Sequence, residues 1–76
     1  MTFIFAVNHF EADRLKVKFG LDKRTCQLLK DAAQLKLHNS CQVYLAPGHK
    51  DNPKWAAVKE VAEELGSVVF LELLLN

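Results

Sequence analysis

Residues 42–75, QVYLAPGHKDNPKWAAVKEVAEELGSVVFLELLL, predict a strand, a helix and a second strand in succession. The first strand is expected at 42–46. Asn52 is the expected N-cap of the helix, Pro53 stands at its first position, where no backbone N–H is needed, and Gly66 follows its end. These boundaries are the clearest in the chain, and a strand-helix-strand unit usually joins two parallel strands.

The helix of this unit has one apolar face, and the strand after it is almost wholly apolar. The inner face of the helix is expected to consist of Trp55, Val58, Ala62 and Leu65. A continuous apolar run such as 68–75 is typical of a strand that is covered on both faces. We therefore expect residues 68–75 at the centre of a sheet.

The amino-terminal segment, Thr2 to Asn8, is a further strand candidate. It is rich in β-branched and aromatic residues and is apolar at both odd and even positions. This pattern predicts a strand that is buried on both faces.

Two structures fit the segment that follows. In residues 14–19 apolar and basic side chains alternate, which is the period of a half-exposed edge strand in a hairpin with the first strand. Alternatively, Asn8 caps a helix, with Glu11 three residues on and an apolar stripe that reaches Phe19. The alternation favours the hairpin, and Gly20 ends either element.

Another helix is predicted between Asp22 and Leu37. The Asp22 carboxylate can accept hydrogen bonds from the free N–H groups of a helix start. Apolar residues then recur at helical spacing, at Leu28, Leu29, Ala32 and Leu35. This helix is expected to pack on the sheet.

Together these elements predict a single α/β domain over residues 1–76. We expect a small two-layer sandwich with a mostly parallel sheet of three or four strands and two helices. The element order is β-β-α-β-α-β if residues 14–19 form a strand, and β-α-β-α-β if they form a helix. A chain of this length buries only about 60% of the surface that its unfolded form exposes, so we expect marginal stability.

The composition excludes several classes of protein. Half of the residues are apolar and a quarter are charged, which is typical of a globular domain. The two cysteines are too few for a disulfide scaffold, no secretion signal precedes them, and no apolar run approaches the roughly 20 residues of a membrane span. We therefore expect a cytoplasmic protein without a membrane-spanning segment, and no cofactor is predicted.

Charge is unevenly distributed along the chain, although the net charge is only +1. Residues 1–50 contain eight Lys and Arg against four Asp and Glu, whereas residues 51–76 contain two against five. The molecule is therefore expected to have a basic and an acidic side, an asymmetry that can orient a partner.

The predicted strands carry more apolar surface than two helices can cover. Helices about 10 Å across cover only one face of a four-stranded sheet whose strands lie about 4.8 Å apart. Exposed apolar surface of this kind usually meets a partner or a second copy of the chain. We therefore expect a homodimer or a complex with another protein, built on an exposed sheet face or an edge strand.

The loop after the strand at 42–46 is a candidate anion site. It follows the carboxyl end of a strand and leads to a helix start, where free N–H groups attract anions. The candidate residues are Gly48, His49, Lys50 and Asn52. A loop that only caps the helix is the simpler interpretation, because a single glycine matches no phosphate-binding motif.

Two other groups of residues are weaker candidates for a functional site. Asn8 and His9 lie near His49 only if the first strand leads directly into a helix. His38 and Cys41 have a metal-ligand spacing, but two ligands need two more, and buried cysteines usually behave as small apolar residues. No metal site and no catalytic residue is therefore predicted.

A basic segment at 14–24 is the strongest electrostatic feature. As a ribbon it could follow a phosphate backbone, but no aromatic residue is interleaved on its charged face for base stacking. Its basic residues are Arg14, Lys16, Lys18, Lys23 and Arg24.

These observations favour a non-enzymatic protein-binding or regulatory module, although an enzyme is not excluded. The basic residues of 14–24, and Trp55 if it is exposed, are the expected partner contacts. Nucleic-acid binding through residues 14–24 is the first alternative. A small anion-binding domain or enzyme that uses the loop 47–52 is the second.

Overall fold

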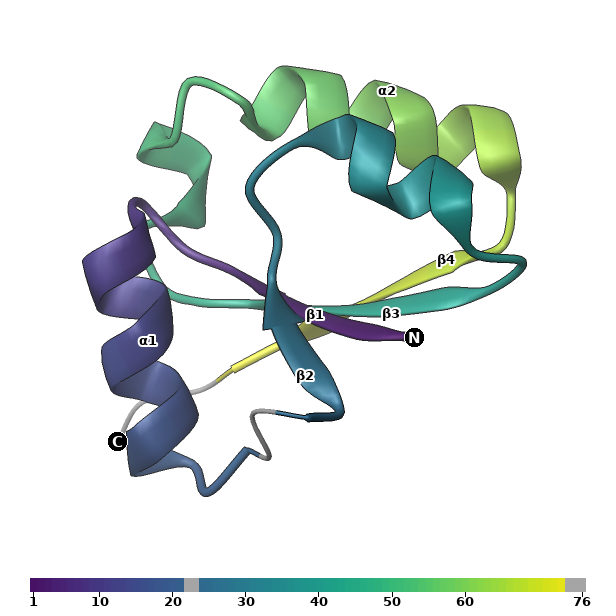
Figure 1. Ribbon diagram of the computed structural model, residues 1–76. Helices are drawn as coiled ribbons and strands as arrows, with labels where there is room; N and C mark the ends of the chain where they lie inside the picture. The colour runs from purple at the N-terminus through teal and green to yellow at the C-terminus, as the bar shows by residue number, and fades with distance from the viewer. Residues whose placement is uncertain (22–23, 74–76) are drawn as a thin grey trace.

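The computed structural model describes residues 1–21 and 24–73 (Figure 1). They form a four-stranded, all-parallel sheet in the order β2-β1-β3-β4. The elements are β1 (Thr2–Phe5), α1 (His9–Lys18), β2 (Cys26–Leu28), the 3-10 helix η1 (Ala32–Leu37), β3 (Cys41–Leu45), the 3-10 helix η2 (His49–Asp51), α2 (Trp55–Leu65) and β4 (Val68–Glu72). The predicted fold class, a small α/β sandwich with a parallel sheet and two helices, is confirmed.

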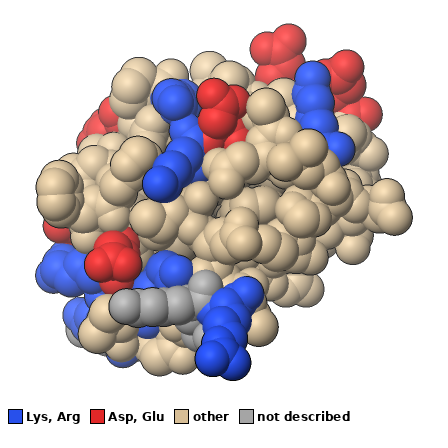
Figure 2. Space-filling model, viewed as in Figure 1, with Lys and Arg blue, Asp and Glu red and all other residues tan. Residues whose placement is uncertain are grey.

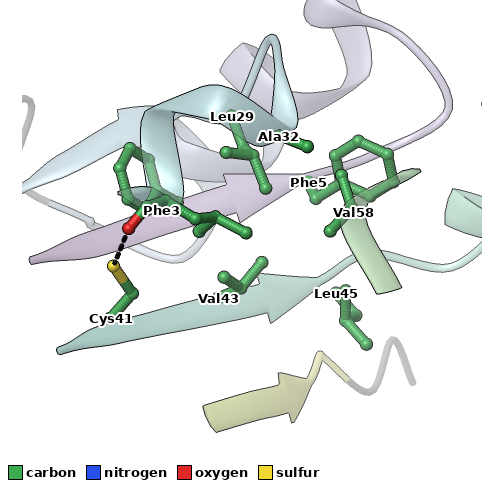
Figure 3. Close-up of a cluster of buried hydrophobic side chains, with 9 residues drawn as sticks. Phe3, Phe5, Leu29, Ala32, Cys41, Val43, Leu45 and Val58 are labelled. Carbon is green, nitrogen blue, oxygen red and sulfur yellow. Dashed lines mark hydrogen bonds between the residues drawn. The ribbon is translucent and has the colours of Figure 1, made fainter. Parts of the chain in front are cut away.

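One face of the sheet packs against α2 and η1. Phe3, Phe5 and Val43 point to this face, where they meet Leu35 of η1 and Val58 of α2 (Figure 3). All five side chains are at most 1% exposed. Burying a large apolar side chain contributes roughly 1.5–3 kcal/mol before entropy is counted, so this cluster is the main stabilising core.

The other face of the sheet packs against α1. Ile4 and Cys26 meet Ala12 and Leu15 of this helix, and all four are buried. Because α1 packs against β1 and β2, the part of this face formed by β3 and β4 carries no helix among the described residues. The helices thus cover the two faces unequally.

The predicted strand at 14–19 is wrong, because these residues lie in and just after α1. Asn8, which was expected at the end of the first strand, caps this helix: its Oδ1 accepts a hydrogen bond from the N–H of Glu11 at 2.9 Å. The helical alternative is therefore confirmed. The alternation was misleading because the helix buries Leu15 but leaves Val17 70% exposed.

The single helix expected over 22–37 is also wrong, and its expected cap, Asp22, lies outside the described residues. β2 and η1 occupy this stretch instead. A capping box separates them, because Asp31 Oδ1 accepts a hydrogen bond from the N–H of Ala33 at 2.9 Å and the N–H of Asp31 donates to Gln34 Oε1 at 2.9 Å. Pairing of β2 with the open side of β1 overrides the helical spacing, as long-range contacts often do.

The most apolar strand lies at an edge of the sheet and not at its centre. Within the described sheet β4 pairs with β3 alone, and the register places Val68 beside Cys41 and Glu72 beside Leu45. Residues 74 and 75, the last of the predicted strand, lie outside the described part. The central strands are β1 and β3, and the observed order β-α-β-β-α-β differs from both predicted orders.

The start of α2 differs slightly from the prediction, whereas its end is confirmed. Lys54, and not Asn52, is the N-cap residue. The Asn52 side chain instead accepts a hydrogen bond from the N–H of Lys54 and donates one to the carbonyl of Ala6, both at 2.9 Å. Gly66 ends the helix with a φ of 69°, a conformation that glycine adopts without strain. Asn52 therefore ties this loop to the end of β1.

Candidate functional site

The outer edge of β4 is the most prominent unpaired feature of the described sheet. The carbonyl of Ser67 and the N–H of Leu73 bond to β3. Alternate residues of a parallel strand bond on opposite sides, so the backbone groups of Val68, Phe70 and Glu72 point away from the sheet. A row of such groups is a template for another strand.

The side chains of β4 alternate between the two faces of the sheet. Val69 and Leu71 point to the face that bears α1 further along, and they are 53% and 36% exposed. Tyr44 of β3 lies beside them and is half-buried. We call these three residues the β4 patch. It is apolar surface without a covering helix, and such surface usually marks an interaction site.

On the opposite face a groove of about 470 Å³ runs between α2 and β4. Val68 and Phe70 of β4 and Trp55 of α2 form its apolar walls. Lys59 and Glu63, one turn apart on α2, supply charge at its rim. The edge of β4 thus has an exposed apolar patch on one side and an apolar groove on the other.

Trp55 is a wall of this groove and not an isolated surface contact. Its ring stacks on Phe5, with centroids 5.8 Å apart, and makes edge contacts with His49 at 4.6 Å and Phe70 at 5.5 Å. The Lys59 ammonium lies 5.5 Å from the Trp55 ring centroid, within the range of a cation-π contact. The indole is therefore half-buried and held on several sides.

The residues of the predicted anion loop lie in two separate places. Gly48, His49 and Lys50 line a hollow of about 320 Å³ together with Glu72, whereas Asn52 lines another crevice. His49 is 7% exposed, and its Nδ1 lies 2.7 Å from a backbone carbonyl of the same loop. The ring is thus bound to its own loop, and the Glu72 carboxylate opposes an anion in that hollow.

The second crevice lies where the strand order reverses between β1 and β3, the usual ligand position in open α/β sheets. Its volume is about 330 Å³, and its polar lining includes Asn8, His9, Lys30, Asn52 and Lys54. The Lys54 ammonium donates to the carbonyl of Lys30 at 2.9 Å, and Asn52 bonds to the chain on both sides. Much of this polar lining is therefore occupied by internal contacts.

The residues of the predicted basic ribbon lie on and after α1. Arg14, Lys18 and Arg24 are exposed, Lys16 is only 6% exposed, and Lys23 lies outside the described residues. Arg14 pairs with the carboxylate of Glu11 at 2.7 Å. Figure 2 shows Lys and Arg gathered around α1 at the lower left and Asp and Glu near the carboxyl end of α2 at the upper right.

The cysteines and His38 do not come together as a metal site. Cys26 and Cys41 are free, buried thiols in the cores on opposite faces of the sheet. Cys41 Sγ donates to the carbonyl of Leu35 at 3.8 Å, and the His38 ring meets the ring of Phe3 at 5.8 Å. Residues 1–21 and 24–73 contain no group of three or more metal-ligating side chains.

Neither protein-family models, nor curated proteins, nor solved structures give a match to this chain. No helix in the described part of the chain is long and apolar enough to cross a membrane. The candidate site therefore rests on geometry. Sequence reasoning missed the β4 patch because an apolar run is equally typical of a central strand. Glu72, a charge within that run, is the residue that signals an exposed position.

Proposed function

We propose that this chain is a non-enzymatic protein-interaction module that assembles through β4, and that its partner is a second copy of the same chain. One observation carries the proposal. β4 is a five-residue edge strand with apolar side chains on both faces and neither lysine nor proline to deter pairing, and its outward backbone groups are unpaired within the described sheet. Addition of a strand at such an edge is a common mode of protein recognition.

A second copy fits this edge without repulsion. A two-fold axis pairs two identical strands antiparallel, and an axis at Phe70 forms the hydrogen bonds through the outward backbone groups. Val69 then lies opposite Leu71 of the second copy, and Val68 lies opposite its Glu72. The two β4 patches merge into one apolar surface, and the two Glu72 carboxylates stand at opposite ends of the seam.

The charges on α2 also favour a second copy over an unrelated protein. Lys59 and Glu63 both line the groove beside β4. The same two-fold axis sets the two α2 helices antiparallel on one face of the joined sheet, so each copy brings one positive and one negative charge, Lys59 and Glu63, to the grooves that flank the seam. Such self-complementary charge selects its partner, while the apolar groove walls at Trp55 and Phe70 become covered.

The remaining polar groups support binding over catalysis and a cytoplasmic setting. The imidazole of His49 and the thiol of Cys41 are held in packing contacts inside the chain, which leaves little freedom for chemistry. Cys26 and Cys41 are free thiols, a state that the reducing cytoplasm maintains. A binding role without catalysis and a cytoplasmic setting are therefore both part of the proposal.

Sedimentation velocity over a range of concentrations tests the dimer. We expect a monomer-dimer equilibrium with a dissociation constant in the range of roughly 1–10 µM. Val69→Glu should weaken it about tenfold, because each copy then sets a carboxylate against Leu71 of the other in place of an apolar cross-strand pair. Val69 is already 53% exposed, so folding of the monomer should be unaffected.

Val17→Glu is the matched control for this experiment. Val17 is 70% exposed on α1, which packs against β1 and β2, the strands on the other side of the sheet from the proposed seam. This variant should dimerise like the wild type. A wild-type chain that is monomeric at roughly 100 µM, or equal weakening by both variants, would rule out the β4 dimer.

A further inference from the structure

A hollow of about 300 Å³ lies beside β2, at the edge of the sheet opposite to β4. It is formed by α1, β2 and the segment that includes η1. The lining contains two cations and two amides but no carboxylate, and it consists of Lys16, Gln27, Leu28, Lys30 and Gln34.

Lys16 is the unusual member of this lining. It is only 6% exposed, although its neighbour on the helix, Val17, is largely in solvent. In residues 1–21 and 24–73 its ammonium forms neither an ion pair nor a side-chain hydrogen bond. A lysine can bury its aliphatic stem against apolar surface and keep its charged end in water. The described residues contain no buried side-chain nitrogen without a hydrogen-bond partner, so the Lys16 ammonium keeps contact with solvent while its stem is buried. An ammonium held by packing at a hollow, with no ion pair in residues 1–21 and 24–73, points to an oxyanion there.

The backbone of β2 adds a directional donor to this hollow. The N–H of Leu29 donates to the carbonyl of Ile4 at 3.0 Å, so the backbone groups of Leu28 point to the open edge. The Leu28 carbonyl accepts a hydrogen bond from Gln34 Nε2 at 3.4 Å, which leaves the Leu28 N–H directed at the hollow. Lys30, which is exposed, supplies a second positive charge at the rim.

The charge of Lys16 also affects a buried group, the thiol of Cys26. Burial raises the pKa of the Cys26 thiol, and the nearby Lys16 ammonium partly offsets this effect. The Lys16 ammonium therefore lies near enough to Cys26, the first residue of β2, to act on its thiol.

We propose that this hollow binds the oxyanion group of a small ligand, a carboxylate or a phosphate. Lys16 provides a charge on a stem that packing holds in place, the Leu28 N–H provides a directional hydrogen bond, and Lys30 provides the outer charge. Charge-assisted hydrogen bonds of this kind are shorter and stronger than neutral ones. The site is at the far edge from β4 and does not depend on the proposed dimer.

Titration with inorganic phosphate and with acetate, followed by amide NMR and calorimetry, tests the proposal. We expect saturable binding of at least one probe, with a dissociation constant of roughly 1 mM, and a shift of the Leu28 amide resonance. Lys16→Met keeps the aliphatic stem and should weaken binding at least about tenfold. Lys18→Met, an exposed lysine on the same helix, is the control and should change it less than about twofold.

Lys30→Met provides a second variant at an exposed position, where folding is not in question. It should weaken binding about threefold, since Lys30 contributes charge at the rim. Tighter binding of phosphate than of acetate identifies a phosphate group, and the reverse identifies a carboxylate. The absence of saturable binding, or equal weakening by Lys16→Met and Lys18→Met, overturns the proposal. Either result would mean that anions are attracted only by the overall positive charge of this surface and not by a defined site.

Discussion

The two edge strands of this sheet are opposite in character. β2 is three residues long, has the lysines Lys16 and Lys30 beside it, and is followed at once by a buried leucine, Leu29. β4 is five residues long, is almost wholly apolar, and leaves Val69 and Leu71 partly in solvent. One sheet thus ends in a short, charged edge and in a long, apolar one.

This difference indicates that the β2 edge is protected against pairing with other chains, whereas the β4 edge is open to it. Short edges and lysines deter pairing with other chains, and Gln34 further blocks the β2 edge by donating to the Leu28 carbonyl. None of these devices is present on β4. The same physical rules therefore identify β2 as the protected edge and β4 as the edge that a partner covers.

Matched leucine substitutions beside the two edges give the largest expected contrast. Leu29 is 3% exposed and packs in the core with Phe3 and Val58, so Leu29→Ala should cost about 2–5 kcal/mol of unfolding free energy. Leu71 is 36% exposed, so Leu71→Ala should cost less than about 1 kcal/mol in the monomer. Urea denaturation at low protein concentration measures both values.

In a dimerisation assay Leu71→Ala should have the larger effect and Leu29→Ala the smaller, the reverse of their order in stability. Leu71→Ala should weaken self-association, because Leu71 is part of the β4 patch. Val17→Ala serves as the control for loss of an exposed apolar side chain. Equal stability losses for Leu29→Ala and Leu71→Ala would contradict the contrast between an anchored and a free edge.

Proline at Glu72 tests the backbone groups of β4 directly. The N–H of Glu72 points away from β3, so Glu72→Pro removes an outward donor without breaking the bonds to β3. In the two-fold dimer one donor is lost from each copy. We expect the dissociation constant to rise about tenfold, which corresponds to about 1.4 kcal/mol.

Glu72→Ala is the control for the side chain in this experiment. It keeps the N–H and removes a charge from the seam, so it should leave the dimer unchanged or slightly tighter. Sedimentation equilibrium distinguishes the two variants. If both weaken the dimer equally, the outward backbone groups of β4 do not form the interface.

On the β2 side, Gln34→Ala tests the protection of the edge. Gln34 Oε1 accepts from the N–H groups of Lys30 at 2.6 Å and Asp31 at 2.9 Å, and its amide donates to Leu28. We expect a loss of about 1 kcal/mol in urea denaturation and faster hydrogen exchange across β2. Gln42→Ala, an exposed glutamine on β3, should have little effect on either measurement.

Residues 42–66 could be predicted well from the sequence because their boundaries depend on local chemistry. Gly66 ends α2 where glycine was expected, and the strand before α2 differs from the prediction by one residue at each end. Local signals failed where long-range pairing decided the structure. β2 lies within a stretch of helical spacing, and only its partner β1 makes it a strand.

The candidate sites were harder to predict than the fold. The position of β4 at an edge depends on strand order, which the sequence does not encode locally. Lys16 was predicted as one of several exposed basic residues, whereas the structure buries it against β2. Whether a helix residue is buried depends on the element that packs against that turn. Predicting the burial of Lys16 would have needed both a helix at α1 and the strand β2, and β2 was not predicted.

The smallest expected effect is a pH dependence of the free energy of unfolding that arises from Cys26, the buried first residue of β2. Burial raises the pKa of the Cys26 thiol above its ordinary value. At neutral pH both the folded and the unfolded chain keep this proton. Above about pH 8.5 the unfolded chain loses it first, so the free energy of unfolding falls as the pH rises further.

Cys26→Ala removes this contribution, so the wild type should lose more stability than the variant between about pH 7 and about pH 10 in urea denaturation. Lys16→Met should enlarge the loss, because the ammonium that partly offsets the raised pKa is gone. Comparing each chain with itself at two pH values removes the constant cost of the substitution. Equal losses in the wild type and Cys26→Ala would show that burial does not raise the pKa of the Cys26 thiol.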